Sequence, residues 1–152
     1  MRWTDGGAGR MNRPMDIRRI TPDYAVSPQI APDDVPDIAA AGFKTVICNR
    51  PDSEVPMELS SEVMRIAVEA AGLRFVENPV THPTMTPERI ATQADAMAEG
   101  PALAYCASGT RSSILWSLAQ AGQMPADDII SATARAGYDL SALRPRLDLA
   151  RG

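Results

Sequence analysis

A cysteine and an arginine with four residues between them form the part of the sequence best suited to chemistry. Cys106 opens the segment CASGTR and Arg111 closes it. The segment follows a predicted buried strand at 102–105 and precedes a predicted helix. Unpaired amides at a helix N-terminus and a nearby arginine favour a thiolate over a thiol. Cys106 is therefore expected to be a nucleophile, with Arg111 stabilising negative charge.

The other residues of this segment, the anion loop (residues 106–111), are small or carry hydroxyl groups. Small side chains let the backbone fold closely around an anion. The hydroxyl of Ser112, just after the loop, is expected to hydrogen-bond the thiolate or to cap the helix. An inert core cysteine is the alternative for Cys106, but it leaves Arg111 unexplained. The residues expected to bind the anion are Ala107, Ser108, Gly109, Thr110 and Ser112.

Strand and helix signals alternate through the middle of the chain, which predicts an α/β fold. We expect a central, mainly parallel sheet of four to five strands with helices on both faces, and reactive loops at the carboxyl ends of the strands. In the helix after the anion loop, Ile114, Leu115 and Leu118 should form the apolar face. Predicted strands cover 16–20, 24–29, 43–50, 73–80 and 102–105, and predicted helices cover 32–41, 58–71, 86–100, 112–122 and 124–136, with a last short helix from 141.

A second loop should reach the same sheet edge as the anion loop, just after the predicted strand at 43–50. It offers Asn49, Arg50 and Asp52 as accessory site residues. Asp52 carries a carboxyl group that can donate a proton to a leaving group. A solvated loop with a local Arg–Asp ion pair is the alternative.

A third loop, at 81–85, contains the single histidine of the chain, His82. Its imidazole is the side chain of this loop that can act as a general acid, because residues 79–86 include no aspartate or glutamate. A surface histidine without a catalytic role is the alternative.

Cys48 is the second cysteine of the chain and lies in a predicted buried strand. Its thiol could form a disulfide with an oxidised or persulfidated Cys106. The alternative, which we favour, is a small apolar residue of the core.

The chain resembles the phosphatase-like domain of the beta-lactamase-hydrolase-like proteins from residue 16 onward. The resemblance rests on CASGTRS, with LAY before it and SSILWSLAQAG after it, and on the ordered segments DIRRITPDYAVSPQI, GFKTVICNRPDSE, FVENPVT and AGYDLSALRPRL. It implies the fold of protein tyrosine and dual-specificity phosphatases, and a site-lining role for residues 49–52. Position 107 is often arginine in these relatives, and its replacement by Ala107 weakens the expected binding of oxyanions.

Two features of the loops separate the reactions that this resemblance allows. Four residues lie between Cys106 and Arg111, as in rhodanese-type sulfurtransferases, whereas the phosphatase signature has five. The phosphatases also carry an acidic aspartate on the loop that corresponds to 81–85, and this chain has none there. Transfer of a sulfane sulfur needs no such acid, because its leaving group is stable as an anion.

We therefore predict a cysteine-dependent sulfurtransferase that works through a Cys106 persulfide. A phosphatase with a phosphocysteine intermediate is the first alternative, and a non-catalytic module that binds an anion or a persulfide is the second. The expected ligands are a small sulfur- or phosphate-containing anion and a thiol acceptor, with no cofactor and no metal. Fused members of the family also imply a persulfide-oxidising partner protein.

Composition argues against several other classes. The 152 residues include 15 Lys and Arg against 19 Asp and Glu, a net charge of −4, which gives no basic footprint for nucleic acid. No apolar run approaches a membrane span, and the first residues lack the apolar core of a secretory signal, so a cytoplasmic protein is expected. We expect residues 1–15 to be a disordered tail and residues 16–152 to form one catalytic domain.

Overall fold

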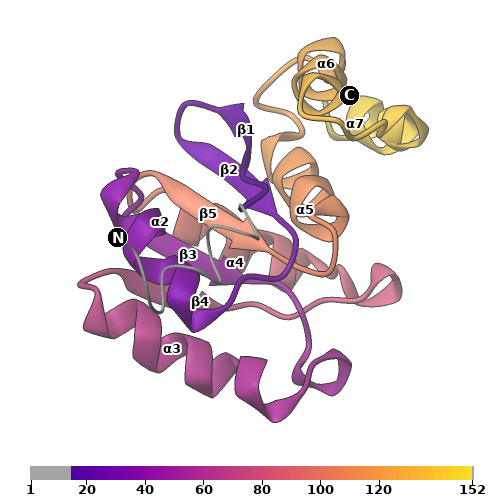
Figure 1. Ribbon diagram of the computed structural model, residues 1–152. Coiled ribbons are helices and arrows are strands. Elements are labelled where there is room, and N and C mark those ends of the chain that lie inside the picture. Colours follow the sequence, from indigo (N-terminus) through magenta and orange to yellow (C-terminus); the bar gives the residue numbers. More distant parts are fainter. Residues whose placement is uncertain (1–14, 152) are drawn as a thin grey trace.

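The computed structural model describes residues 15–151, in which one sheet lies between two layers of helices (Figure 1). The sheet order is β1-β2-β5-β3-β4, with β1 antiparallel to β2 and all other neighbours parallel. This arrangement confirms the predicted fold class. The tail predicted over 1–15 lies outside the described residues, apart from Met15. The strands are β1 (Arg18–Thr21), β2 (Tyr24–Ser27), β3 (Thr45–Cys48), β4 (Arg74–Glu77) and β5 (Ala102–Tyr105).

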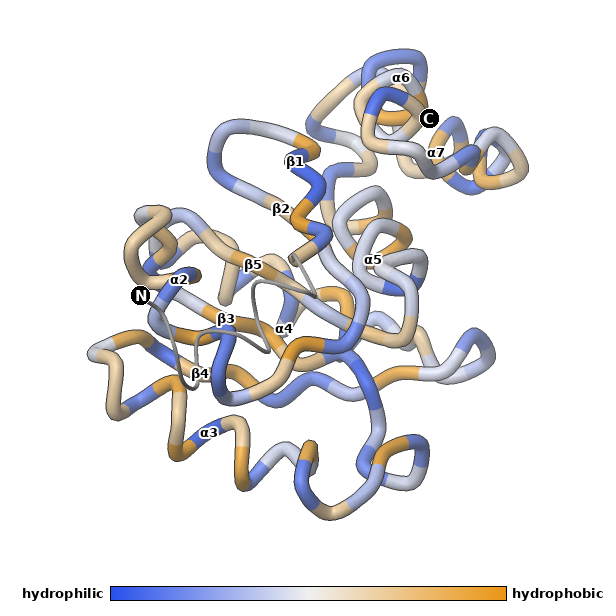
Figure 2. Tube along the Cα trace, viewed as in Figure 1, coloured by the Kyte–Doolittle hydropathy of each residue, from blue (hydrophilic) through white to orange (hydrophobic). Residues whose placement is uncertain are grey.

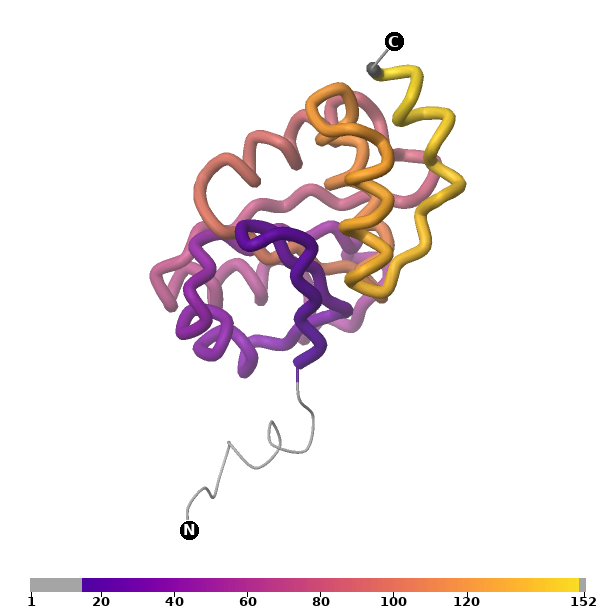
Figure 3. Tube along the Cα trace, turned by 90° about the horizontal axis from the view of Figure 1, so that it is seen from above, coloured from indigo at the N-terminus to yellow at the C-terminus, as the bar shows by residue number. Residues whose placement is uncertain are grey.

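The helices divide between the two faces of the sheet. One face is covered by α2 (Val35–Ala40) and α3 (Ser61–Ala70). The other is covered by α4 (Pro87–Met97), α5 (Thr110–Gln120), α6 (Ala126–Arg135) and α7 (Arg144–Arg151). The last two lie side by side in two views (Figures 1 and 3). Within residues 15–151, no helix has both the length and the apolar character that a bilayer crossing demands.

Alternation along the strands builds a separate core on each face. Val46 and Leu103 pack with α2 and α3, whereas the next residues, Ile47 and Ala104, pack with the helices of the opposite face. Successive side chains of a strand point to opposite faces, so a strand buried on both sides is apolar throughout. Figure 2 shows hydrophobic and hydrophilic residues alternating along α3, as expected for a helix with one buried face.

Helix α5 departs from the predicted amphipathic pattern. Ile114 and Leu118 are only partly buried, while the serines at 112, 113 and 117 are buried with Leu115 and Trp116. The reason is that α4, α6 and α7 all contact α5, so it has more than one buried side. The hydroxyls of Ser113 and Ser117 donate to carbonyl oxygens four residues earlier, at 2.8 and 2.9 Å, which satisfies them without water.

Candidate active site

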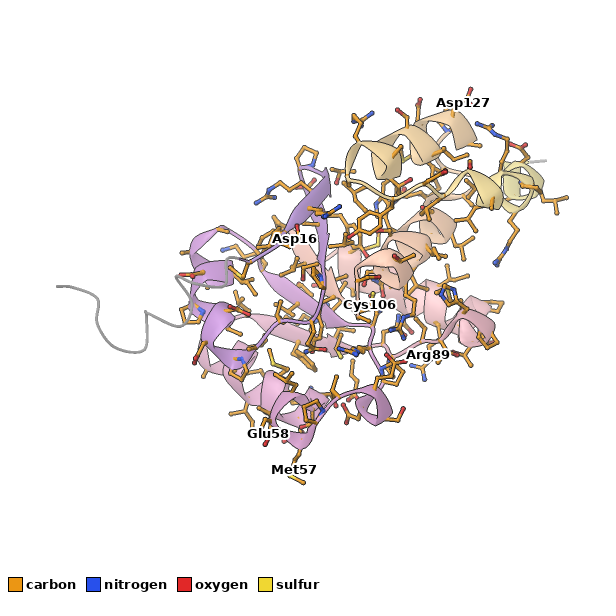
Figure 4. All side chains as sticks on the ribbon, turned by 45° about the vertical axis from the view of Figure 1, so that its right-hand side comes forward. Asp16, Met57, Glu58, Arg89, Cys106 and Asp127 are labelled. Carbon is orange, nitrogen blue, oxygen red and sulfur yellow. The ribbon has the colours of Figure 1, made fainter. Side chains whose placement is uncertain are left out.

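The anion loop joins β5 to the N-terminus of α5 and holds a buried thiol. The Cys106 side chain is fully buried, and its Sγ accepts a hydrogen bond from the Gly109 N–H at 3.1 Å. Figure 4 shows Cys106 in the interior beside α5, far from the exposed Met57. An amide donor and the positive end of a helix both stabilise negative charge on this sulfur.

Gly109 is required where the loop turns into the helix. Its φ of 94° lies in the left-handed region, which residues with a Cβ adopt reluctantly. A Cβ at this position would also collide with the hydroxyl oxygen of Tyr138. The loop thus needs a glycine for both its backbone conformation and its packing.

Arg111 is held by a bidentate ion pair with Glu54. Its Nη1 and Nη2 donate to the two carboxylate oxygens at 2.9 and 2.8 Å, and Nη1 also donates to the Val80 carbonyl oxygen at 2.9 Å. The hydrogen bonds to Arg111 lower the pKa of the Glu54 carboxyl, so Glu54 is ionised. The pKa of Arg111 is raised, first by Glu54 and further by the nearby Cys106.

Glu54 also pairs with a second arginine, so that its carboxylate lies between two guanidinium groups. Arg50 Nε approaches Glu54 Oε1 at 3.2 Å, and Arg50 Nη1 donates to Gln29 Oε1 at 3.3 Å. Glu54 was not among the predicted site residues, although it ends a loop at the expected sheet edge. The available sequence signal was its spacing of four residues from Arg50, and the structure places it on a short 3-10 turn η2 (Asp52–Glu54).

A surface cavity of about 350 Å³ opens beside the Arg111–Glu54 pair. Cys106 is not among the residues that line it, because the thiol lies deeper than this mouth. His82, which begins the 3-10 turn η4 (His82–Thr84), lies at this mouth, and its accessory role stays a prediction. The lining residues are Glu54, Thr81, His82, Ser108, Thr110 and Arg111.

The anion loop presents its small residues in two ways. Ala107 and Ser108 are exposed, whereas Gly109 is buried. The hydroxyl groups of Ser108 and Thr110 lie 3.0 Å apart and share a hydrogen bond at the mouth of the site. The loop therefore offers hydroxyl groups outward and an amide inward.

A buried polar network lies beneath the loop and corrects the role expected for Ser112. Its hydroxyl donates to Asn49 Oδ1 at 2.8 Å, not to the thiolate. Asn49 Nδ2 in turn donates to Gln93 Oε1 at 2.9 Å, and Gln93 Nε2 donates to the Tyr24 hydroxyl at 2.9 Å. Tyr24 closes the ring by donating to the Ser112 carbonyl oxygen at 2.8 Å. Asn49 thus fixes the start of α5 instead of lining the cavity.

Asp52 faces away from the cavity and serves another helix. Its two carboxylate oxygens accept from the Ser61 N–H at 2.8 Å and from the Ser61 hydroxyl at 3.1 Å. It therefore satisfies donors at the start of α3, as negative side chains commonly do at helix N-termini. The carboxylate that this loop brings to Arg111 is that of Glu54.

The two cysteines lie on opposite faces of the sheet. Cys48 is in register with Tyr105 and packs in the core beside α2 and α3. Cys106 lies just beyond β5, in the loop that leads into α5, and interacts electrostatically with Tyr24 of the core on the face of α4 and α5. Burial raises the pKa of the Cys48 thiol. A disulfide between the two would require this edge of the sheet to rearrange, so the interpretation of Cys48 as a core residue fits the register.

The sequence model of one family, the phosphatase-like domain of the beta-lactamase hydrolase-like proteins, matches residues 16–123. The chain belongs to this family. A beta-lactamase hydrolase-like protein of Agrobacterium fabrum is 38% identical over 122 residues, which cover 78% of this chain but only 28% of the relative. The phosphatase-like domain described here therefore corresponds to less than a third of that longer protein.

Solved structures of other proteins have the same fold as this phosphatase-like domain. A candidate phosphatase from Neisseria meningitidis Z2491 is 37% identical, with a TM-score of 0.78 over 91% of this chain and 100% of its own. Tk-PTP in its active form is 15% identical, with a TM-score of 0.66 over 90% of this chain and 95% of its own. The first supports relatedness, and the second shows the protein tyrosine phosphatase-like fold.

Proposed function

We propose that this phosphatase-like domain is a cysteine-dependent phosphatase in which Cys106 is the nucleophile. The observation that carries the proposal is the position of Cys106 Sγ at the N-terminus of α5. This sulfur accepts a hydrogen bond from the Gly109 N–H at 3.1 Å, and Arg111 lies beside it. The likeness to the Neisseria candidate phosphatase over the whole of that chain supports it.

In the first step the Cys106 thiolate attacks the phosphorus of a phosphate monoester. An S–P bond forms, and the bond from phosphorus to the ester oxygen breaks, with its electron pair leaving on that oxygen. Water then attacks phosphorus and gives one proton to the base that protonated the ester oxygen. The S–P bond breaks with its electron pair returning to sulfur, which releases inorganic phosphate and regenerates the thiolate. The anion-loop amides and Arg111 stabilise the phosphoryl oxygens in both steps.

The leaving oxygen needs a proton, and His82 is the residue at the cavity mouth that can supply it. Glu54 lies at the same mouth, but Arg111 keeps its carboxyl ionised and therefore unable to donate. Asp52 is committed to Ser61. We therefore assign the proton transfer to His82; an acidic leaving group departs as the anion and needs no proton.

Sulfur transfer, the function favoured by the sequence analysis, is the second candidate, and the short loop favours it. With four residues between Cys106 and Arg111, the structure directs one loop amide, that of Gly109, at the sulfur. A persulfide needs charge stabilisation at one atom, whereas a phosphoryl group has three oxygens. In this reaction the thiolate attacks the outer sulfur of a donor and a new S–S bond forms. The donor's bond to that outer sulfur breaks, and its electron pair leaves with the rest of the donor, as a thiolate or sulfite, without protonation.

One experiment separates the two reactions. The purified domain and Cys106→Ser are incubated with an aryl phosphate, or with thiosulfate or glutathione persulfide, and analysed by intact mass and by product release. Phosphate release that requires Cys106, without a sulfur adduct, supports the phosphatase. A gain of one sulfur atom on Cys106 that thiol removes supports the sulfurtransferase instead. Absence of both reactions, with anion binding retained, supports the non-catalytic module.

A further inference from the structure

We propose that Tyr138 is a positioning residue that aims a loop amide at the Cys106 sulfur. Its hydroxyl donates to the Ser108 carbonyl oxygen at 3.0 Å. That oxygen belongs to the same peptide group as the Gly109 N–H, which donates to Cys106 Sγ at 3.1 Å. One peptide group is therefore held at both ends, by Tyr138 at its oxygen and by the thiol at its hydrogen. The inference rests on the proposed use of the Cys106 thiolate, whichever reaction follows.

Planarity makes this contact directional. The C=O and N–H of a peptide group point in opposite directions in one plane, so fixing the oxygen fixes the hydrogen. Gly109 is the residue that can most easily tolerate rotation of this peptide, since glycine populates both signs of φ. A rotated peptide would turn the Ser108 carbonyl oxygen toward the sulfur and repel a thiolate. Tyr138 holds the orientation in which the donor faces the sulfur.

The same contact strengthens the donor. A hydrogen bond to a carbonyl oxygen polarises the peptide group, and linked hydrogen bonds reinforce one another in a buried site. Burial raises the pKa of Tyr138, so its hydroxyl keeps its proton and remains a donor at neutral pH. Tyr24 and Arg111 are two further titratable groups that interact electrostatically with Cys106.

Tyr138 is itself fixed from two sides, although it lies in the segment that joins α6 to α7. Its N–H donates to the Thr133 carbonyl oxygen at 2.9 Å. The Arg18 guanidinium lies 5.6 Å from its ring centroid, and Arg18 Nη1 donates to the Ala136 carbonyl oxygen at 3.2 Å. The C-terminal helices therefore reach the nucleophile through this ring, 30 residues after Ser108.

The test is a pH titration of the Cys106 thiolate by its ultraviolet absorbance, with the curve of Cys106→Ser subtracted. This readout requires neither a substrate nor access to the buried sulfur. Tyr138→Phe removes the hydroxyl and keeps the ring. Tyr105→Phe is the matched control, because it removes a buried hydroxyl beside Cys48 on the opposite face of the sheet.

We expect the proton affinity of Cys106 to rise roughly three- to tenfold in Tyr138→Phe, from the weakening of one charge-assisted hydrogen bond. The thiolate midpoint then moves to higher pH, while Tyr105→Phe keeps the wild-type midpoint. Equal midpoints in a folded Tyr138→Phe and the wild type would overturn the proposal. If Tyr138→Phe does not fold, Arg18→Gln is the second variant, because it removes the guanidinium that packs on the Tyr138 ring. Arg18→Gln should raise the thiolate midpoint by a smaller amount, and an unchanged midpoint would overturn the proposal equally.

A shift in Tyr138→Phe stands whether or not the domain hydrolyses phosphate, because the titration contains no substrate. A wild type without phosphatase activity, together with a shifted midpoint in Tyr138→Phe, would refute the proposed function and leave the role of Tyr138 intact. An unchanged midpoint in an active Tyr138→Phe would do the reverse.

Discussion

The ion pair between Arg111 and Glu54 predicts that removing the carboxylate improves anion binding. An incoming anion needs the guanidinium nitrogens that Glu54 now occupies at 2.8 and 2.9 Å. The Arg111 side chain is 11% exposed and that of Glu54 is 31% exposed, so the pair is stronger than a fully solvated one. We place its contribution at about 1–2 kcal/mol, which converts to a change of about 5- to 30-fold in affinity.

The assay is calorimetric titration of inorganic phosphate into the wild type and Glu54→Gln. We expect the dissociation constant to fall by about 5- to 30-fold in the variant. Glu62→Gln is the matched control, because Glu62 pairs with Arg65 on the solvent-facing side of α3 and should leave phosphate binding unchanged. Weaker or equal binding in Glu54→Gln would refute the reasoning and show that Glu54 orients Arg111 for the anion instead of competing with it.

The same pair gives stability a defined dependence on pH. The pKa of Glu54 is below its ordinary value of 4.5, so the folded protein binds this proton less readily than the unfolded chain. The contribution of the ionised Glu54 carboxylate to folding stability is therefore complete above the ordinary carboxyl pKa, and it is lost as pH falls through the lowered value. In urea unfolding, the free energy of unfolding of Glu54→Gln should consequently be lower than that of the wild type at neutral pH. The two values should converge at acid pH.

Three further substitutions test the support of the site. Gly109→Ala should lower the free energy of unfolding in urea by about 2–4 kcal/mol, because it combines a left-handed φ with a collision at Tyr138, and a loss below about 1 kcal/mol would contradict this. Asn49→Leu should cost about 2–4 kcal/mol by leaving buried partners unpaired, measured in the same way, and a variant as stable as wild type would show that the network is dispensable. Cys48→Ala should keep full turnover, and peptide mapping of peroxide-treated wild type should find no disulfide between the two cysteines; its rapid formation would show that the strand edge rearranges.

Local signals in the sequence predicted the elements that carry the site. The strand, loop and helix around Cys106 occur in the expected order, because a buried strand, a small-residue turn and a helix are all short-range patterns. The helix boundaries differ from the predicted 112–122, since α5 covers Thr110–Gln120 and Thr110 and Arg111 of the anion loop are already helical. Thr86 and Pro87 likewise begin α4, and the Thr86 hydroxyl accepts from the Arg89 N–H at 3.3 Å. Capping depends on neighbouring residues only, so a single sequence contains what is needed.

Long-range contacts account for what the sequence could not predict. Glu54 reaches Arg111 across 57 positions and Tyr138 reaches Ser108 across 30, and neither pair has a local spacing that would reveal it. The buried serines of α5 look polar in sequence, and only the packing of three other helices around α5 places them inside. The hydroxyl of Ser112 was expected to bond the thiolate or to cap the helix, whereas the fold supplies Asn49, just after β3, as its acceptor.

The buried ring of Tyr24, Gln93, Asn49 and Ser112 joins elements from four parts of the chain: β2, α4, the end of β3 and α5. No member can be released without leaving another polar group unpaired in the interior, so these elements must separate together. In hydrogen–deuterium exchange, the amides at the start of α5 should therefore exchange through global unfolding. Those of the largely exposed 81–86 segment at the cavity mouth should exchange through local opening. We therefore expect the floor of the site and its entrance to belong to different cooperative units, so that the entrance changes shape while Cys106 stays in place.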